Sequence, residues 1–132
     1  MSLADKDREE IVKLRLDKAN NALAEVPVLI ENKFYTTAAN RLYYACFYAV
    51  GALLVNDKHD AHTHKGVKTL LGLHYVKESK IDKSFAKMYE RLFTMRQRGD
   101  YEDTFIIEEE KIKPYIEQAK NFITEIEHLI YK

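Results

Sequence analysis

Apolar residues recur at intervals of three and four along most of the chain, which is the spacing of one face of an α-helix. The period-two alternation that marks a half-buried strand is not the dominant pattern. Only 4 glycines and 2 prolines interrupt the helical spacing. The sequence therefore predicts an all-α fold, a bundle of about five helices without strands.

The first two expected helices are marked by a proline and a pair of threonines. Pro27 should kink or end the first helix, since proline lacks the N–H that the helix needs. Thr36 or Thr37 offers a hydroxyl to cap the start of the second helix. The five expected spans are about 5–30, 37–55, 64–77, 84–99 and 108–131.

The remaining boundaries rest on polar caps and one glycine. Thr63 can cap the third helix, and Asp82 or Ser84 can cap the fourth. Gly99 is the residue best able to adopt the left-handed conformation that ends a helix, so we predict that the fourth helix stops there. Pro114 either lies in the first turn of the last helix or kinks it.

The second helix is apolar or aromatic nearly all round, which is typical of the centre of a bundle. Its apolar run from Leu42 to Leu54 is too short to span a bilayer, so we expect no membrane segment. A single cysteine, Cys46, excludes an internal disulfide and suits a reducing compartment. With no hydrophobic signal region at the start, we expect a cytoplasmic protein forming one domain over residues 1–132.

The chain carries 21 Lys or Arg and 21 Asp or Glu, so its formal net charge is zero. Any contact with a nucleic acid or an anionic membrane must therefore be local. Basic residues predominate from Lys58 to Arg98, whereas only acidic residues are charged between Asp100 and Glu110. We expect the functional site at the boundary between this basic segment and this acidic segment.

Arg96 and Asp100 are four residues apart and share a helix face, whereas Tyr101 would point about 140° away from Arg96 on a straight helix. If the helix unwinds at Gly99, Tyr101 can turn back toward the other two. A guanidinium, which binds phosphate bidentately, would then meet two groups able to orient or exchange a proton. The ordinary alternative is a surface ion pair with Tyr101 packed beside it.

Four histidines resemble a metal cluster, because His59, His62 and His64 are closely spaced and His74 follows. No cysteine lies nearby, and a polar loop can accumulate histidines without binding anything. We therefore predict no metal site and no cofactor.

Arg41, Tyr44 and Tyr48 form a ridge at helical spacing on the second helix. The ridge could line a pocket or meet a partner helix, or it could be core packing with its hydroxyls hydrogen-bonded. Both interpretations stay open, since an arginine in a mostly apolar helix needs a partner for its charge.

Three segments in this order resemble the HEPN superfamily, in particular its small stand-alone prokaryotic branch. They are residues 38–47 (AANRLYYACF), residues 63–67 (THKGV) and residues 92–101 (LFTMRQRGDY). Together they span most of the chain. The resemblance implies an HEPN-like bundle, similar to a nucleotidyltransferase substrate-binding subunit, that forms a homodimer with two fourth helices facing one cleft.

The resemblance also implies a function, because many HEPN proteins are metal-independent ribonucleases, often toxins, encoded beside a minimal nucleotidyltransferase. Their motif is an arginine followed four to six residues later by a histidine. Arg96 matches the arginine, but the residue five positions further on is Tyr101. We expect Arg96, Asp100 and Tyr101 to form the catalytic group. The expected nucleotide- or RNA-binding residues are Arg41, Tyr44, His64, Lys65, Arg91, Gln97 and Arg98.

Two functions stay open at this point. The first is nucleotide or RNA binding at a dimer cleft, with metal-independent cleavage. The second is a non-catalytic regulatory partner of a minimal nucleotidyltransferase, in which Tyr101 contacts the partner or is modified. A purely structural bundle is the third and weakest alternative.

Overall fold

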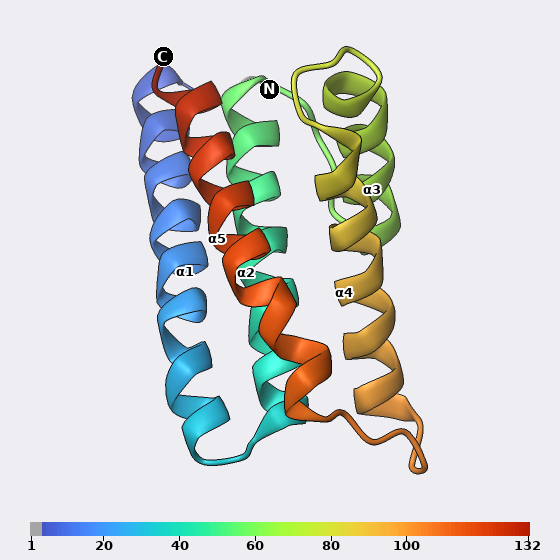
Figure 1. The fold of residues 1–132 in the computed structure, drawn as a ribbon. Coiled ribbons are helices and arrows are strands. Elements are labelled where there is room, and N and C mark those ends of the chain that lie inside the picture. The colour runs from blue at the N-terminus through green and yellow to red at the C-terminus, as the bar shows by residue number, and fades with distance from the viewer. Residues whose placement is uncertain (1–3) are drawn as a thin grey trace.

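The computed structural model describes residues 4–132, and every regular element in that part of the chain is helical. α2 lies in the middle and contacts α1, α3, α4 and α5, with α1 and α3 on opposite sides of it (Figure 1). The all-α prediction is confirmed. The elements are α1 (Asp5–Glu31), α2 (Tyr35–Asn56), α3 (His64–Leu71), the π-helical turn η1 (Gly72–Val76), α4 (Lys83–Tyr101) and α5 (Glu109–Ile130).

α2 is the core helix because small or apolar residues occupy nearly all of its faces. Five alanines along it are buried and let the neighbouring helices approach closely, while Leu42, Tyr43 and Leu53 fill the space between them. By length and composition alone α2 could cross a membrane, but 61% of its most apolar 18-residue stretch is buried inside the bundle. Its apolar character is therefore explained by packing against four helices.

Three helical segments end at a non-glycine residue with positive φ: Lys33 (62°), Lys58 (63°) and Ser79 (59°). After α1, the N–H of Lys33 bonds the Ile30 carbonyl at 2.9 Å, and the next N–H bonds a carbonyl five residues back at 2.8 Å. The same pair of bonds recurs after α2 and after η1. This is the Schellman ending, which usually places glycine where lysine or serine stands here.

The predicted caps are confirmed for two helices and wrong for one. Thr63 Oγ1 accepts a hydrogen bond from the Gly66 N–H at 2.9 Å, and Asp82 accepts one from the Ser84 N–H at 2.8 Å. α2 instead begins at Tyr35, without a side-chain cap, so the predicted threonine caps at positions 36 and 37 are wrong. The N-cap position is occupied by Phe34, whose side chain has no oxygen to accept a backbone N–H.

Neither proline ends a helix. Pro27 lies inside α1, which continues to Glu31, so of the two predicted effects, a kink or an end, the end is wrong. A proline this close to the end removes one backbone bond, while Val26 and Ala22 keep α1 packed in the core. Pro114 likewise lies inside α5. The third helix, expected to continue to residue 77, changes to the π-helical turn after Leu71.

Candidate functional site

The guanidinium of Arg96, on α4, is held against two rings and a carboxylate. Its Nη2 donates a hydrogen bond to the Tyr44 hydroxyl on α2 at 3.0 Å, and its Cζ lies 5.3 Å from the centre of the Tyr44 ring and 5.7 Å from that of Tyr43. Its Nε lies 3.3 Å from Asp100 Oδ2. The side chain is only 13% exposed, so Arg96 is fixed rather than free to sample solvent.

Arg96 has hydrogen-bonding capacity to spare. A guanidinium has five N–H groups, and within residues 4–132 only the bond to Tyr44 and the ion pair with Asp100 engage it. Its Nε is buried without a hydrogen bond of good geometry. Within residues 4–132 no hydrogen bond uses Nη1, so its two N–H groups remain for a ligand.

Asp100 connects Arg96 to the start of α2. Its Oδ2 accepts a weak hydrogen bond from Asn40 Nδ2 at 3.4 Å, and its side chain is 30% exposed. We call Arg96, Asp100, Asn40 and Tyr44 the Arg96 patch. The patch is one immobilised positive charge beside a half-exposed carboxylate, on two packed helices.

His64, the first residue of α3, lies next to this patch. Its Nδ1 is 2.7 Å from the Tyr43 hydroxyl, which is 3.4 Å from the Tyr89 hydroxyl. Its ring centre is 5.9 Å from that of Tyr44, the ring that Arg96 also covers. Burial, and then the positive charge of Arg96, lower the pKa of His64 below its usual 6.5, while burial raises the pKa of Tyr43 to about 12. At neutral pH the pair is an uncharged imidazole bonded to a phenol.

A cavity of about 440 Å³ opens beside His64. It combines a partly buried aromatic wall at Phe93 with amide and ammonium groups at its rim. Lys68 is paired with Glu90 at 2.8 Å, whereas Lys65 has no ion pair within residues 4–132. Aromatic walls and cationic rims suit a base and its phosphate. The lining residues are His64, Lys65, Lys68, Tyr89, Phe93 and Gln97.

A family model for the HEPN domain matches residues 12–129. The chain belongs to the HEPN family. The match includes all of α2, α3 and α4, so the Arg96 patch and His64 lie inside the HEPN domain. The resemblance read from three sequence segments is confirmed.

Similar proteins carry two kinds of name. The HEPN chain is 36% identical over 124 residues to a Thermotoga maritima protein named "UPF0332 protein", covering 94% of each. It is 30% identical over 129 residues to a Methanocaldococcus jannaschii protein named "Putative toxin MJ0605", covering 98% of this chain and 90% of the relative. A second protein from that organism, "Putative toxin MJ0142", is 28% identical over 116 residues, covering 88% of this chain and 78% of the relative. Two of these three relatives thus bear the name of a putative toxin.

The predicted break at Gly99 is wrong, and with it the predicted position of Tyr101. α4 continues to Tyr101, and no glycine among residues 4–132 has positive φ. A Cβ at position 99 would lie 2.9 Å from Ile107 Cδ1 and 3.3 Å from Thr36 Cγ2, so the glycine permits close packing rather than a turn. On the unbroken helix Tyr101 points away from Arg96 and is 74% exposed. The phenol hydrogen-bonded to Arg96 is that of Tyr44.

Arg41 lies at the edge of the Arg96 patch. Its Nε is 3.6 Å from Glu25 Oε2, and its Cζ is 5.8 Å from the centre of the Tyr44 ring, on which Arg96 also lies. Two arginines thus share one tyrosine ring. Of the predicted ridge, Tyr44 joins the site, while Tyr48 lies under Lys18 at 5.7 Å.

Two of the predicted basic residues lie outside the patch. Arg98 is paired with Glu102 at 2.9 Å, and its Cζ lies 4.1 Å above the Phe105 ring. Arg91 lines a separate cavity against α5, with Met95 among its neighbours. Arg91 and Arg96 are five positions apart, which places them on different faces of α4.

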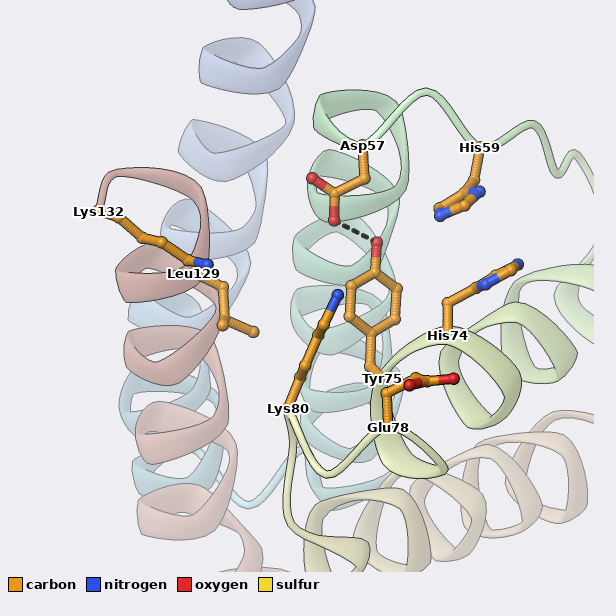
Figure 2. Close-up of a pocket in the computed structure, with 8 residues that line it drawn as sticks. All are labelled: Asp57, His59, His74, Tyr75, Glu78, Lys80, Leu129 and Lys132. Atoms are coloured by element: carbon orange, nitrogen blue, oxygen red, sulfur yellow. Dashed lines mark hydrogen bonds between the residues drawn. The ribbon is translucent and has the colours of Figure 1, made fainter.

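The histidines do not form one cluster. His59 and His74 stack face to face with centres 4.0 Å apart and planes 10° apart, and line a cavity of about 310 Å³ (Figure 2). Their lone pairs, which lie in the ring planes, do not converge on one point. His62 lies beside Asp60 at 2.9 Å, and His64 is bonded to Tyr43. Within residues 4–132 no group of three or more His, Cys, Asp or Glu side chains could hold a metal ion.

The sequence interpretation missed two residues of the site, Asn40 and Tyr43. Asn40 precedes Arg41 and is one of many polar residues at helix starts, so nothing local marks it. Tyr43 is fully buried, and its place in an apolar run is typical of a packing residue. Its hydroxyl matters only because α3 and α4 bring His64 and Tyr89 to it, a long-range arrangement.

Proposed function

We propose that this HEPN protein binds RNA at the Arg96 patch and cleaves it without a catalytic metal ion. One observation supports this most: a guanidinium fixed by Tyr44 and Asp100 keeps N–H donors that no other group within residues 4–132 uses. A fixed guanidinium binds a phosphate oxygen pair and stabilises the charge that develops on it during cleavage. Two relatives are named putative toxins, and RNA cleavage is one activity that makes a protein toxic.

The cavity beside His64 extends the proposal to the whole nucleotide. Lys65 and Gln97 lie at its rim, where they can contact phosphate and base edges, and Phe93 offers a ring face for stacking. Because the overall charge is zero, affinity depends on these local groups. Cys46 is a free, buried thiol, which suits the cytoplasm as the place of this activity.

The direct test is RNA cleavage in excess EDTA by the purified chain and by Arg96→Gln. The variant keeps a hydrogen-bonding amide but loses the charge, and we expect cleavage to fall by about 100-fold or more. Arg96→Lys keeps the charge without the fork geometry and should give an intermediate rate. Circular dichroism of each variant separates loss of function from loss of fold.

Lys87→Gln is the matched control, since it removes one exposed positive charge from the same helix outside the patch. We expect it to cleave at the wild-type rate. A wild type that does not cleave RNA in EDTA would overturn the proposal. Equal losses in Arg96→Gln and Lys87→Gln would show a diffuse charge effect instead of a site.

A second candidate function, a partner-binding module, is favoured by an exposed apolar pair near the end of α4. Tyr101 is 74% exposed and Ile106 is 73% exposed. We propose that this end meets a second copy of the chain, with a minimal nucleotidyltransferase as the alternative partner. Light scattering on the purified chain tests the homodimer, and Ile106→Glu should shift it to monomer if this end forms the interface.

A further inference from the structure

RNA cleavage at a fixed guanidinium leaves one chemical need unmet, because a group must remove the proton of the attacking 2′-hydroxyl. Three side chains near Arg96 could be considered. Asp100 is already paired with Arg96 and Asn40, and the Tyr44 hydroxyl accepts a bond from Arg96. The third, His64, has one engaged nitrogen and one free nitrogen.

The free nitrogen of His64 is Nε2. Within residues 4–132 its ring is hydrogen-bonded only through Nδ1, to Tyr43. The side chain is half-buried and lines the 440 Å³ cavity, so the ring is anchored on one edge and open to a ligand on another. His64 and Arg96 both pack on the Tyr43 and Tyr44 rings, which places a base and a phosphate-binding cation around one small region.

We propose that His64 is the general base of the cleavage reaction and that Tyr43 is the residue that positions it. This inference rests on the proposed function. For Nε2 to accept a proton, Nδ1 must carry the hydrogen of the neutral ring and donate it to the Tyr43 oxygen, while the Tyr43 hydroxyl donates to Tyr89. Tyr43 stays a phenol throughout.

The step is a transesterification that needs no co-reactant. His64 Nε2 takes the 2′-hydroxyl proton, and the 2′-oxygen forms a bond to the adjacent phosphorus while the bond from phosphorus to the 5′-oxygen breaks. The leaving 5′-oxygen receives a proton from water, and protonated His64 returns its proton to water. The products are a 2′,3′-cyclic phosphate and a 5′-hydroxyl end, with Arg96 bound to the phosphate oxygens.

The titratable and charged groups around His64 decide its pH behaviour. Tyr43 and Tyr44 face it from α2, Arg96 and Tyr89 face it from α4, and Lys65 and Lys68 lie on its own helix. None of these is a carboxylate that would favour protonation. The ring is therefore neutral, and available as a base, throughout the neutral range, and cleavage should fall only as the pH drops below 6.5.

The test compares wild type, His64→Gln and Tyr43→Phe for both RNA binding and RNA cleavage. Binding is measured with a 2′-fluoro RNA, which cannot form the attacking hydroxyl. We expect His64→Gln to bind within about twofold of wild type but to cleave roughly 100-fold to 10,000-fold more slowly. Tyr43→Phe should cleave more slowly by a smaller factor, with the acid limb of its pH profile displaced.

Chemical rescue separates proton transfer from a structural role. Free imidazole added to His64→Ala should restore part of the cleavage rate, whereas a merely structural histidine would not be rescued. His74→Gln, in the other cavity, is the histidine control and should behave as wild type.

The outcomes are distinguishable. Unchanged cleavage in His64→Gln, or a rate loss explained wholly by weaker binding, would overturn the role of His64 and leave the proposed function intact. A wild type that leaves RNA intact overturns both.

Discussion

Two regions along α2 contain a tyrosine with a short hydrogen bond, yet they differ in what they can do. In the first, the Tyr43 hydroxyl lies 2.7 Å from His64, next to the Arg96 patch. In the second, which we call the Asp57 pocket, the Tyr75 hydroxyl donates to Asp57 at 2.6 Å (Figure 2). The pocket is lined by Asp57, His59, His74, Tyr75, Glu78, Lys80, Leu129 and Lys132.

The bond in the Asp57 pocket is structural. It joins η1 to the end of α2, and burial together with Asp57 raises the pKa of Tyr75 well above its usual value. The pocket mixes acids and bases, so it presents no single charge to a ligand. Near Arg96, by contrast, a cation keeps unused donors beside a neutral base and a cavity. A short hydrogen bond alone is thus a poor guide to function, and unused donors beside open space are a better one.

Removing each hydroxyl in turn should separate the two regions most clearly. Tyr75→Phe should lower the free energy of unfolding by about 1–2 kcal/mol, because a partly buried bond to a carboxylate is lost, and should leave RNA cleavage unchanged. Tyr43→Phe should lower it by about 1 kcal/mol and also slow cleavage. Urea unfolding and cleavage assays on both variants measure this. Equal effects of the two variants on cleavage would show that the two regions do not differ in function.

The backbone beside the Asp57 pocket offers a smaller test. Lys58 adopts positive φ, which a side chain disfavours, so Lys58→Gly should raise the free energy of unfolding by about 0.5 kcal/mol. RNA cleavage should not change, since Lys58 lies at the far end of α2 from the Arg96 patch. Thermal unfolding is the measurement, and a loss of stability would mean that the lysine side chain makes a needed contact.

The smallest expected effect is on the pH dependence of stability. Because the pKa of His64 is lowered in the folded state, the unfolded chain takes up its proton first as pH falls. Stability that is present above about pH 6.5 is therefore lost below it, and His64→Gln should flatten this slope between pH 7 and 5. Urea midpoints across that range measure it. An identical slope in the variant would show that folding does not lower the pKa of His64.

The fold could be predicted from the sequence because helical periodicity and the caps at Thr63 and Asp82 are local signals. The helix ends at Lys33 and Lys58 could not, since their left-handed residues are not glycines. The one glycine taken as a terminator, Gly99, is instead needed for packing against Ile107 and Thr36, which both lie outside its helix.

The site was predictable in part. Arg96 and Asp100 share a helix face at a spacing that sequence alone shows, and their ion pair is present. The phenol was assigned to the wrong tyrosine, because helix continuity at Gly99 decides where Tyr101 points. Tyr44 takes that place through packing of α2 on α4, which no local pattern encodes.

The most direct test of the account is where RNA binds. Isotope-labelled wild-type protein would be titrated with 2′-fluoro RNA while the NMR signals of the Arg96 guanidinium and of the His64, His59 and His74 rings are followed. The account predicts saturable shifts at Arg96 and His64, with His59 and His74 unchanged. Shifts confined to His59 and His74, or no shift at Arg96 at saturating RNA, would contradict it.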